Sequence, residues 1–209
     1  VLRARIGDEV TLCNGDGYDY IYVIKAIEKK STALTLIERR VNLSEPKVKA
    51  ALMVSLLKGD KLDYVCQKLT ELGFSDIYPV VTDYTQVKRE SVKVERLNKI
   101  CKEAAQQCGR GKVAVCHSPM TLDEAIAEAK KFDNVFFFYE KDGKSFKEAA
   151  ANLVGSSAIF VGGEGGWSEE EANKLGFAER INLGKRILRA ETACVTAAAL
   201  IMYESGELK

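Results

Sequence analysis

The chain has 209 residues, of which 46% are hydrophobic, and a formal net charge of +1 at pH 7. This length allows one large domain or two small ones with a buried core, and the absence of any membrane-length apolar run predicts a soluble, cytoplasmic protein without a membrane partner. The six cysteines include no C-x-x-C pair, so we expect neither a metal site nor a disulfide framework, as is typical of a reducing compartment.

The small net charge conceals an uneven distribution along the chain. Residues 1–112 carry 20 Lys or Arg against 15 Asp or Glu, whereas residues 113–184 carry 7 against 12. A basic half is compatible with an RNA or another phosphate-bearing partner. Ordinary solvated surface would give the same counts and stays open as the alternative.

Residues 1–45 have the composition of β structure. Short β-rich runs at 10–13, 18–27 and 33–37 are separated by Asn14-Gly15-Asp16-Gly17, a hairpin turn signal, and by Lys29-Lys30-Ser31. So few residues cannot supply an independent core, and we therefore expect a small β-barrel-like module or part of one. Residues 42–46 are the best candidate for a linker.

From about residue 47 the pattern alternates between strands and helices. Strands are predicted at 50–56, 77–81, 113–116, 135–139, 157–161 and 178–183, and helices at 60–72, 92–108, from 121, 168–175 and 191–203. Thr121 with Glu124 and Ser168 with Glu171 have capping-box spacing. This alternation predicts a mostly parallel α/β sheet that binds ligands outside the carboxyl ends of its strands.

Four glycines surround Glu164 in the stretch GGEGGWSEEE, residues 162–171, between a predicted strand and a predicted helix. Such a turn lets the backbone approach a ligand closely. Its spacing matches neither the G-x-G-x-x-G fingerprint nor a P-loop, which disfavours binding of a dinucleotide or a nucleoside triphosphate. A tight connection without a ligand is the alternative explanation.

A second unusual stretch is INLGKRILRAETACVTAAAL, residues 181–200. Arginines flank Ile187 and Leu188, and two buried apolar side chains on a loop can wall an aromatic base. The helix that follows is rich in small residues, which would let another subunit pack closely across a two-fold axis. These small residues are Ala193, Val195, Ala197, Ala198 and Ala199.

Together, GGEGGWSEEE and LGKRILRAETA resemble the two signature loops of the SPOUT-class RNA methyltransferases, and in particular the family that methylates N3 of a uridine in 16S ribosomal RNA. Relative to the family patterns GPEGGFS and LGxRILRTETA, this chain has Gly163, Trp167 and Ala190 at the differing positions. The stretches LLKGDKLDYVCQKLTELG (56–73) and EAAQQCGR (103–110) match as well, and 1–3 is similar to the end of a longer N-terminal motif. The resemblance covers essentially the whole chain.

The resemblance implies two domains. A PUA-like RNA-binding β domain would occupy residues 1–45, N-terminally incomplete because family members begin further upstream. An α/β SPOUT methyltransferase domain with a C-terminal trefoil knot would occupy residues 47–209. The implied cofactor is S-adenosylmethionine, the implied substrate is 16S ribosomal RNA within the small ribosomal subunit, and the implied assembly is a homodimer.

The glycine turn and the basic-apolar loop are the expected cofactor site. Glycines would approach the ribose and the amino-acid tail, and the 183–188 segment would form the adenine slot. Glu140, at the end of a neighbouring strand, could equally be a solvated carboxylate. The expected cofactor residues are Tyr139, Glu140, Gly162, Gly163, Glu164, Gly165, Gly166, Leu183, Gly184, Ile187, Leu188, Arg189 and Thr192.

Catalysis requires help in removing the N3 proton of uracil and in holding the resulting anion. Arg186 and Arg189 are the candidates, because a guanidinium can meet a carbonyl oxygen that carries developing charge. Each could instead clamp a phosphate or form a salt bridge in the dimer. No general base is identified. We expect Glu164 to fix the loop and His117 to be structural.

Candidate RNA contacts lie in the matched motifs, with solvated surface as the alternative for each lysine: Arg3, Lys58, Lys61, Lys68, Gln107 and Arg110. Arg110 is the first candidate, because arginine both stacks on bases and grips phosphate. Two other functions stay open. One is a related methyltransferase acting on tRNA or on a ribose 2′-OH, and the other is an RNA-binding protein of this fold that has lost its cofactor.

Overall fold

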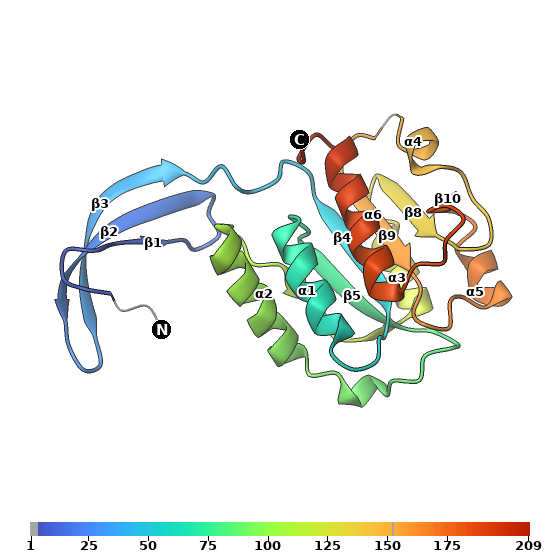
Figure 1. Cartoon of the computed structure of the whole chain (residues 1–209), viewed down its shortest axis with the longest axis horizontal. Helices are drawn as coiled ribbons and strands as arrows, with labels where there is room; N and C mark the ends of the chain where they lie inside the picture. Colours follow the sequence, from blue (N-terminus) through green and yellow to red (C-terminus); the bar gives the residue numbers. More distant parts are fainter. Residues whose placement is uncertain (1–3, 152) are drawn as a thin grey trace.

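The computed structural model describes residues 4–151 and 153–209 and contains two β-sheets joined by an extended segment (Figure 1). The first sheet is antiparallel, in the order β1 (Glu9–Leu12), β2 (Tyr18–Ile27) and β3 (Thr32–Val41). Gly15 and Gly17 in the predicted hairpin turn have φ of +86° and +90°, which glycine adopts readily. The expected barrel is not closed within the described residues, because β1 and β3 pair only with β2.

The second sheet has seven strands in the order β10-β8-β9-β4-β5-β6, with β7 also pairing with β5. Every strand pair in it is parallel. Its strands are β4 (Ala50–Ser55), β5 (Asp76–Val81), β6 (Val115–Cys116), β7 (Met120–Thr121), β8 (Asn134–Phe138), β9 (Ser157–Val161) and β10 (Glu179–Ile181). The predicted parallel α/β architecture is confirmed.

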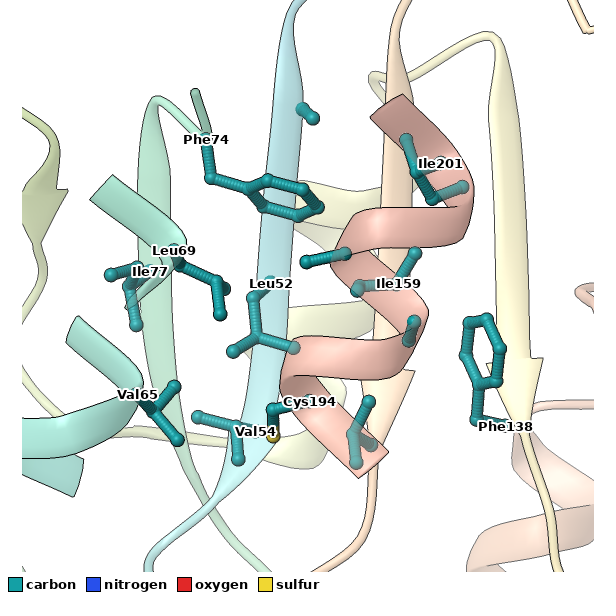
Figure 2. Packing of buried hydrophobic residues seen from close by; sticks show 14 of the residues in the cluster. Leu52, Val54, Val65, Leu69, Phe74, Ile77, Phe138, Ile159, Cys194 and Ile201 are labelled. Carbon is teal, nitrogen blue, oxygen red and sulfur yellow. The ribbon is translucent and has the colours of Figure 1, made fainter. Parts of the chain in front are cut away.

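Helices cover both faces of this sheet. Helices α1 (Lys61–Glu71), α2 (Val94–Cys108) and α6 (Ala190–Glu204) form one layer, and α3 (Leu122–Ala129) and α5 (Glu169–Lys174) form the other. The short α4 (Phe146–Ala149) adds Phe146 to the first layer's core, and a 3-10 turn, η1 (Arg89–Ser91), precedes α2. Figure 2 shows Leu52 of β4 between Leu69 of α1 and Cys194 of α6.

The local signals that define helix ends are confirmed. Thr121 with Glu124 and Ser168 with Glu171 each form a complete capping box. Glu171 is buried despite its charge, because it also accepts a hydrogen bond from the backbone N–H of Asp83 at 2.8 Å. None of the helices within the described residues is long and apolar enough to span a bilayer.

The small residues of α6 pack mainly inside their own chain. Ala197 and Ala198 are fully buried in the core beneath α6, so assigning these two to contact with another subunit was wrong. Their small size instead brings the helix close to β4 and β9, which it contacts. Ala193, Val195 and Ala199 are partly exposed.

Candidate functional site

Loops that follow neighbouring strands enclose a cavity of about 920 Å³. The lining comes chiefly from residues 138–143 after β8, 161–166 after β9 and 182–190 after β10, with Lys61 and Ala193 completing it. Because these strands are parallel, their carboxyl ends lie at one edge of the sheet. The cavity therefore lies where the sequence placed the ligand site.

The glycine turn and the basic-apolar loop, about twenty residues apart in sequence, meet in this cavity. All the expected cofactor residues line it except Thr192, which is exposed in the first turn of α6. The candidate catalytic residue Arg186 lines it as well. Thr192 does not reach the cavity because the helical phase of α6 turns Ala190 and Ala193 toward it instead.

The glycine turn presents backbone to the cavity and has little room for side chains. Gly166 has φ of +68°, and a Cβ there would lie 3.1 Å from Oε1 of Glu140. A Cβ on Gly162 would lie 2.9 Å from Nε1 of Trp167. The turn is closed by a hydrogen bond from the N–H of Gly166 to the carbonyl of Gly163 at 3.1 Å. This wall can therefore approach a ligand through its peptide groups.

A charged cluster braces the glycine turn against α1. Lys61 Nζ donates to Glu164 Oε1 at 2.6 Å and lies 4.0 Å from Glu191 Oε2. Burial opposes ionisation of Glu164, but the hydrogen bonds from Lys61 and from backbone N–H groups outweigh it and hold the pKa of Glu164 below its usual value. One of those N–H groups belongs to Lys58, at 3.3 Å. Glu164 therefore fixes the loop, as predicted from the sequence.

Arg186 and Arg189 lie exposed on the loop between β10 and α6. The ion-paired arginines of the described residues are Arg40, Arg96, Arg110 and Arg180, so both guanidinium groups stay available to a ligand. Ile187 between them is 85% exposed. The expectation that Ile187 is buried was wrong, because no element among the described residues packs over the loop.

Comparison with known proteins agrees with this geometry. Residues 44–202 match a family model described as an RNA methyltransferase domain, and residues 1–37 match one described as an RNA methyltransferase PUA domain. The ribosomal RNA small subunit methyltransferase E of Bacillus subtilis is 31% identical over 222 residues, covering all of this chain and 87% of the relative. The protein of the same name from Rickettsia conorii is 32% identical and covers 96% of this chain and 83% of the relative.

The chain belongs to the ribosomal RNA small subunit methyltransferase E family. Solved structures support the assignment. A Legionella pneumophila protein in complex with S-adenosylmethionine has 30% identity and a TM-score of 0.87, covering 97% of this chain and 85% of that one. A methyltransferase E from Neisseria gonorrhoeae, bound to S-adenosylmethionine, has 26% identity and a TM-score of 0.86 at the same coverage. The family resemblance seen in the sequence motifs is confirmed.

Arg110 of this methyltransferase is not placed to contact RNA. It is 6% exposed, and its Nη1 donates to the carbonyls of Thr70 and Phe74 at 2.9 and 2.8 Å. Its Nη2 donates to Glu45 Oε2 at 3.1 Å. The prediction that Arg110 is the first RNA contact was wrong, because the left-handed cap at Gly109 (φ +77°) turns the chain back into the protein after α2.

The other expected RNA contacts of the methyltransferase are dispersed. Lys61 lies in the cavity in its ion pair with Glu164, whereas Lys58 is exposed beside the same loop. Lys68 pairs with Glu71 on α1, and Gln107 is exposed on α2, where it lines a second hollow whose lining includes both carboxylates and Arg96. Arg3 lies outside the described residues.

Segment 139–145 of the methyltransferase is a strap that hydrogen-bonds to residues 180–182 and was not predicted from the sequence. Lys144 N–H donates to the carbonyl of Arg180 at 2.9 Å, and Asn182 N–H donates back to Lys144 at 3.0 Å. A Cβ on Gly143 would lie 2.8 Å from the backbone nitrogen of Asn182. The only available signal was the turn-like Lys141-Asp142-Gly143-Lys144, which gives no indication of its distant partner.

The remaining candidate groups of the methyltransferase have structural roles. His117 Nε2 lies 2.8 Å from Asp76 Oδ1, and its ring stacks on Tyr78 with centroids 4.1 Å apart. All six cysteines are free thiols. Within residues 4–151 and 153–209, no cluster of three or more His, Cys, Asp or Glu side chains is arranged to hold a metal ion.

Proposed function

We propose that this methyltransferase transfers the methyl group of S-adenosylmethionine to N3 of one uridine in 16S ribosomal RNA. The observation that carries the proposal is the meeting of the glycine turn and the 182–190 loop in one cavity, with Arg186 and Arg189 free of carboxylate partners beside it. The names of the Bacillus and Rickettsia relatives support a small-subunit RNA substrate. The S-adenosylmethionine bound to the Neisseria relative supports the same molecule as the cofactor of this chain.

The residues that line the cavity fit S-adenosylmethionine. The molecule combines an adenine, a ribose and an amino-acid tail with a cationic sulfonium. The backbone of the glycine turn can meet the polar ribose and tail, since side chains are excluded at Gly162 and Gly166. Leu183 and Leu188 offer apolar surface to the adenine. When bound, the cofactor would supply an electrophilic methyl group to the deprotonated N3, with S-adenosylhomocysteine as the neutral leaving group.

The contribution of the protein to the chemistry is to hold the uracil anion. Loss of the N3 proton places negative charge on the two adjacent carbonyl oxygens, which Arg186 and Arg189 can meet as charged hydrogen-bond donors. Glu164 is poorly suited to take the proton, because its carboxylate already accepts bonds from Lys61 and from backbone N–H groups. We therefore assign the proton to solvent and much of the acceleration to proximity and orientation.

The proposal includes the rest of the family architecture. Residues 1–45 are an RNA-binding domain. In support of this role, the guanidinium of Arg39 stacks on the Tyr18 ring, 3.6 Å from its centroid, and such a pair offers a surface to nucleotides. The 139–145 strap and the 182–190 loop belong to a trefoil knot. In a homodimer, the partly exposed face of α6 and the exposed Ile187 and Tyr203 are covered by the second subunit.

Mass spectrometry of RNA tests the proposal directly. Small ribosomal subunits from a strain lacking the gene are incubated with the purified protein and S-adenosylmethionine, and the digested RNA is compared with a 3-methyluridine standard. One new 3-methyluridine in 16S RNA is the expected product. A methyl group on a ribose oxygen, or one incorporated only into tRNA, would exclude the proposed reaction.

A further inference from the structure

An aromatic side chain outside the cavity lies directly against the glycine turn. Tyr84 follows β5 and is 54% exposed. A Cβ built on Gly165 would lie 2.6 Å from Tyr84 Cβ and 3.3 Å from Tyr84 Cγ. Gly165 itself lines the cavity. The tyrosine therefore lies on the outer side of the same backbone that forms the cavity wall.

The turn that carries Tyr84 is held on both sides. Across the turn, the Thr82 N–H donates to Thr85 Oγ1 at 3.0 Å. Thr82 Oγ1 in turn donates to Ser55 Oγ of β4 at 3.1 Å. Within it, Asp83 Oδ2 accepts from Ser168 Oγ at 2.5 Å while its N–H donates to Glu171. The backbone that carries the ring is thus held by α5 and β4, and little backbone entropy would be lost when a ligand contacts the ring.

The hydrophobic interior, as far as the structure describes it, does not include this ring. Tyr84 belongs to neither of the two hydrophobic core clusters formed by the described residues. Lys88 and Arg89 follow on the same exposed connection, and Lys58 is exposed beside Glu164. An exposed aromatic ring on a hydrogen-bonded turn, against the wall of a pocket for a nucleotide-like molecule and followed along the chain by two exposed basic residues, has the composition of a stacking platform for single-stranded nucleic acid.

We propose that Tyr84 stacks on a nucleobase of the RNA substrate at the rim of the cofactor cavity. This inference rests on the proposed RNA methyltransferase function and adds a specific substrate contact to it. The contact depends on the π face of the ring, so it tolerates any base and any aromatic side chain. It acts on RNA affinity, because the ring lies outside the cavity where the methyl group is transferred.

Four variants separate stacking from other roles: Tyr84→Ala, Tyr84→Phe, Tyr84→Trp and, as a matched control, Phe177→Ala. Phe177 is 42% exposed and lies before β10, at the opposite edge of the sheet from the cavity. Equilibrium binding and single-turnover methylation are measured on unmethylated small subunits, and S-adenosylhomocysteine affinity is measured by calorimetry. Tyr84→Ala should weaken RNA binding by about 10- to 100-fold.

The other variants define the interpretation. Tyr84→Phe and Tyr84→Trp should bind RNA within about threefold of the wild type, and Phe177→Ala should be unchanged, because the aromatic face at position 84 is what matters. S-adenosylhomocysteine affinity should be unchanged in all four. Normal RNA affinity in Tyr84→Ala would overturn the proposal. A Phe variant as weak as the Ala variant, or loss of S-adenosylhomocysteine affinity in Tyr84→Ala, would overturn it too.

Failure of the proposed function gives a different result. If the wild type binds the subunits without methylating uridine N3, the assigned reaction is wrong, and a selective loss of binding in Tyr84→Ala still supports the stacking contact. If the wild type binds no RNA, both proposals are excluded. The binding and methylation measurements therefore report on the two inferences separately.

Discussion

Arginines of this methyltransferase occur in two contrasting regions. At the junction between the two sheets, Arg110 is 6% exposed and its guanidinium donates to two backbone carbonyls and to Glu45. At the cofactor cavity, Arg186 and Arg189 are exposed and have no carboxylate partner among the described residues. The same side chain thus serves assembly of the fold in one place and stays available for a ligand in the other.

Loss of a buried polar group costs more free energy of unfolding than loss of an exposed one. A buried guanidinium must have its hydrogen bonds satisfied within the protein, and removing it leaves its partners unpaired. An exposed guanidinium contributes little to stability, because water replaces any partner it loses. Substitutions in the two regions should therefore separate folding from catalysis.

The largest effect is expected at the junction. Arg110→Ala should lower the free energy of unfolding by about 3–5 kcal/mol, because it breaks the buried ion pair with Glu45 and removes the guanidinium donor to the carbonyls of Thr70 and Phe74. Urea denaturation of Arg110→Ala measures the loss. Arg186→Ala is the matched control and should change stability by no more than about 0.5 kcal/mol. Equal stability of the two variants would remove the distinction between the regions.

At the cavity, the effect should appear in the rate. Arg186→Ala or Arg189→Ala should slow single-turnover methylation by about 10²-fold at saturating RNA, because one charged donor to the uracil anion is lost. Lys185→Ala, on the same loop, serves as the charge-matched control and should retain most of the rate. Wild-type rates for both arginine variants would show that neither holds the anion.

Two glycines with the same backbone strain can sharpen the comparison further. Gly166 and Gly206 have φ of +68° and +75°, so alanine at either should cost about 1–2 kcal/mol of stability. Only Gly166 lines the cavity, and a Cβ there would approach Glu140 at 3.1 Å. Calorimetric titration should give at least about tenfold weaker S-adenosylhomocysteine binding for Gly166→Ala and no change for Gly206→Ala. An equal loss of S-adenosylhomocysteine affinity in both variants would assign the effect to backbone strain alone.

The smallest effect concerns pH. The folded pKa of Glu164 lies below its ordinary value of 4.5, so the Lys61–Glu164 pair contributes fully above pH 4.5 and is lost as the pH falls through the folded value. S-adenosylhomocysteine affinity of the wild type should therefore decline below pH 4.5. Glu164→Gln should already bind more weakly at pH 7 and show a shallower decline. A parallel decline in both proteins would exclude Glu164 as its source.

Local patterns in the sequence determined much of this protein. Alternating apolar segments predicted the parallel sheet, and Thr121 with Glu124 marked a helix start from residues three positions apart. The same alternation predicted a ligand site outside the carboxyl ends of the strands, and the cavity lies there. Such features depend on near neighbours and on the periodicity of strands and helices, both of which are visible in one sequence.

Tertiary structure alone decided which side chains find partners within the chain and which stay exposed. Lys61 pairs with Glu164, 103 positions away, and Arg110 meets Glu45 across 65. Ile187 is exposed although an apolar side chain favours burial, because no element in the described part of the chain packs over its loop. The partners of a side chain come from segments that only folding brings together. A shift of one residue along a helix, or a left-handed cap at its end, turns a side chain toward different partners.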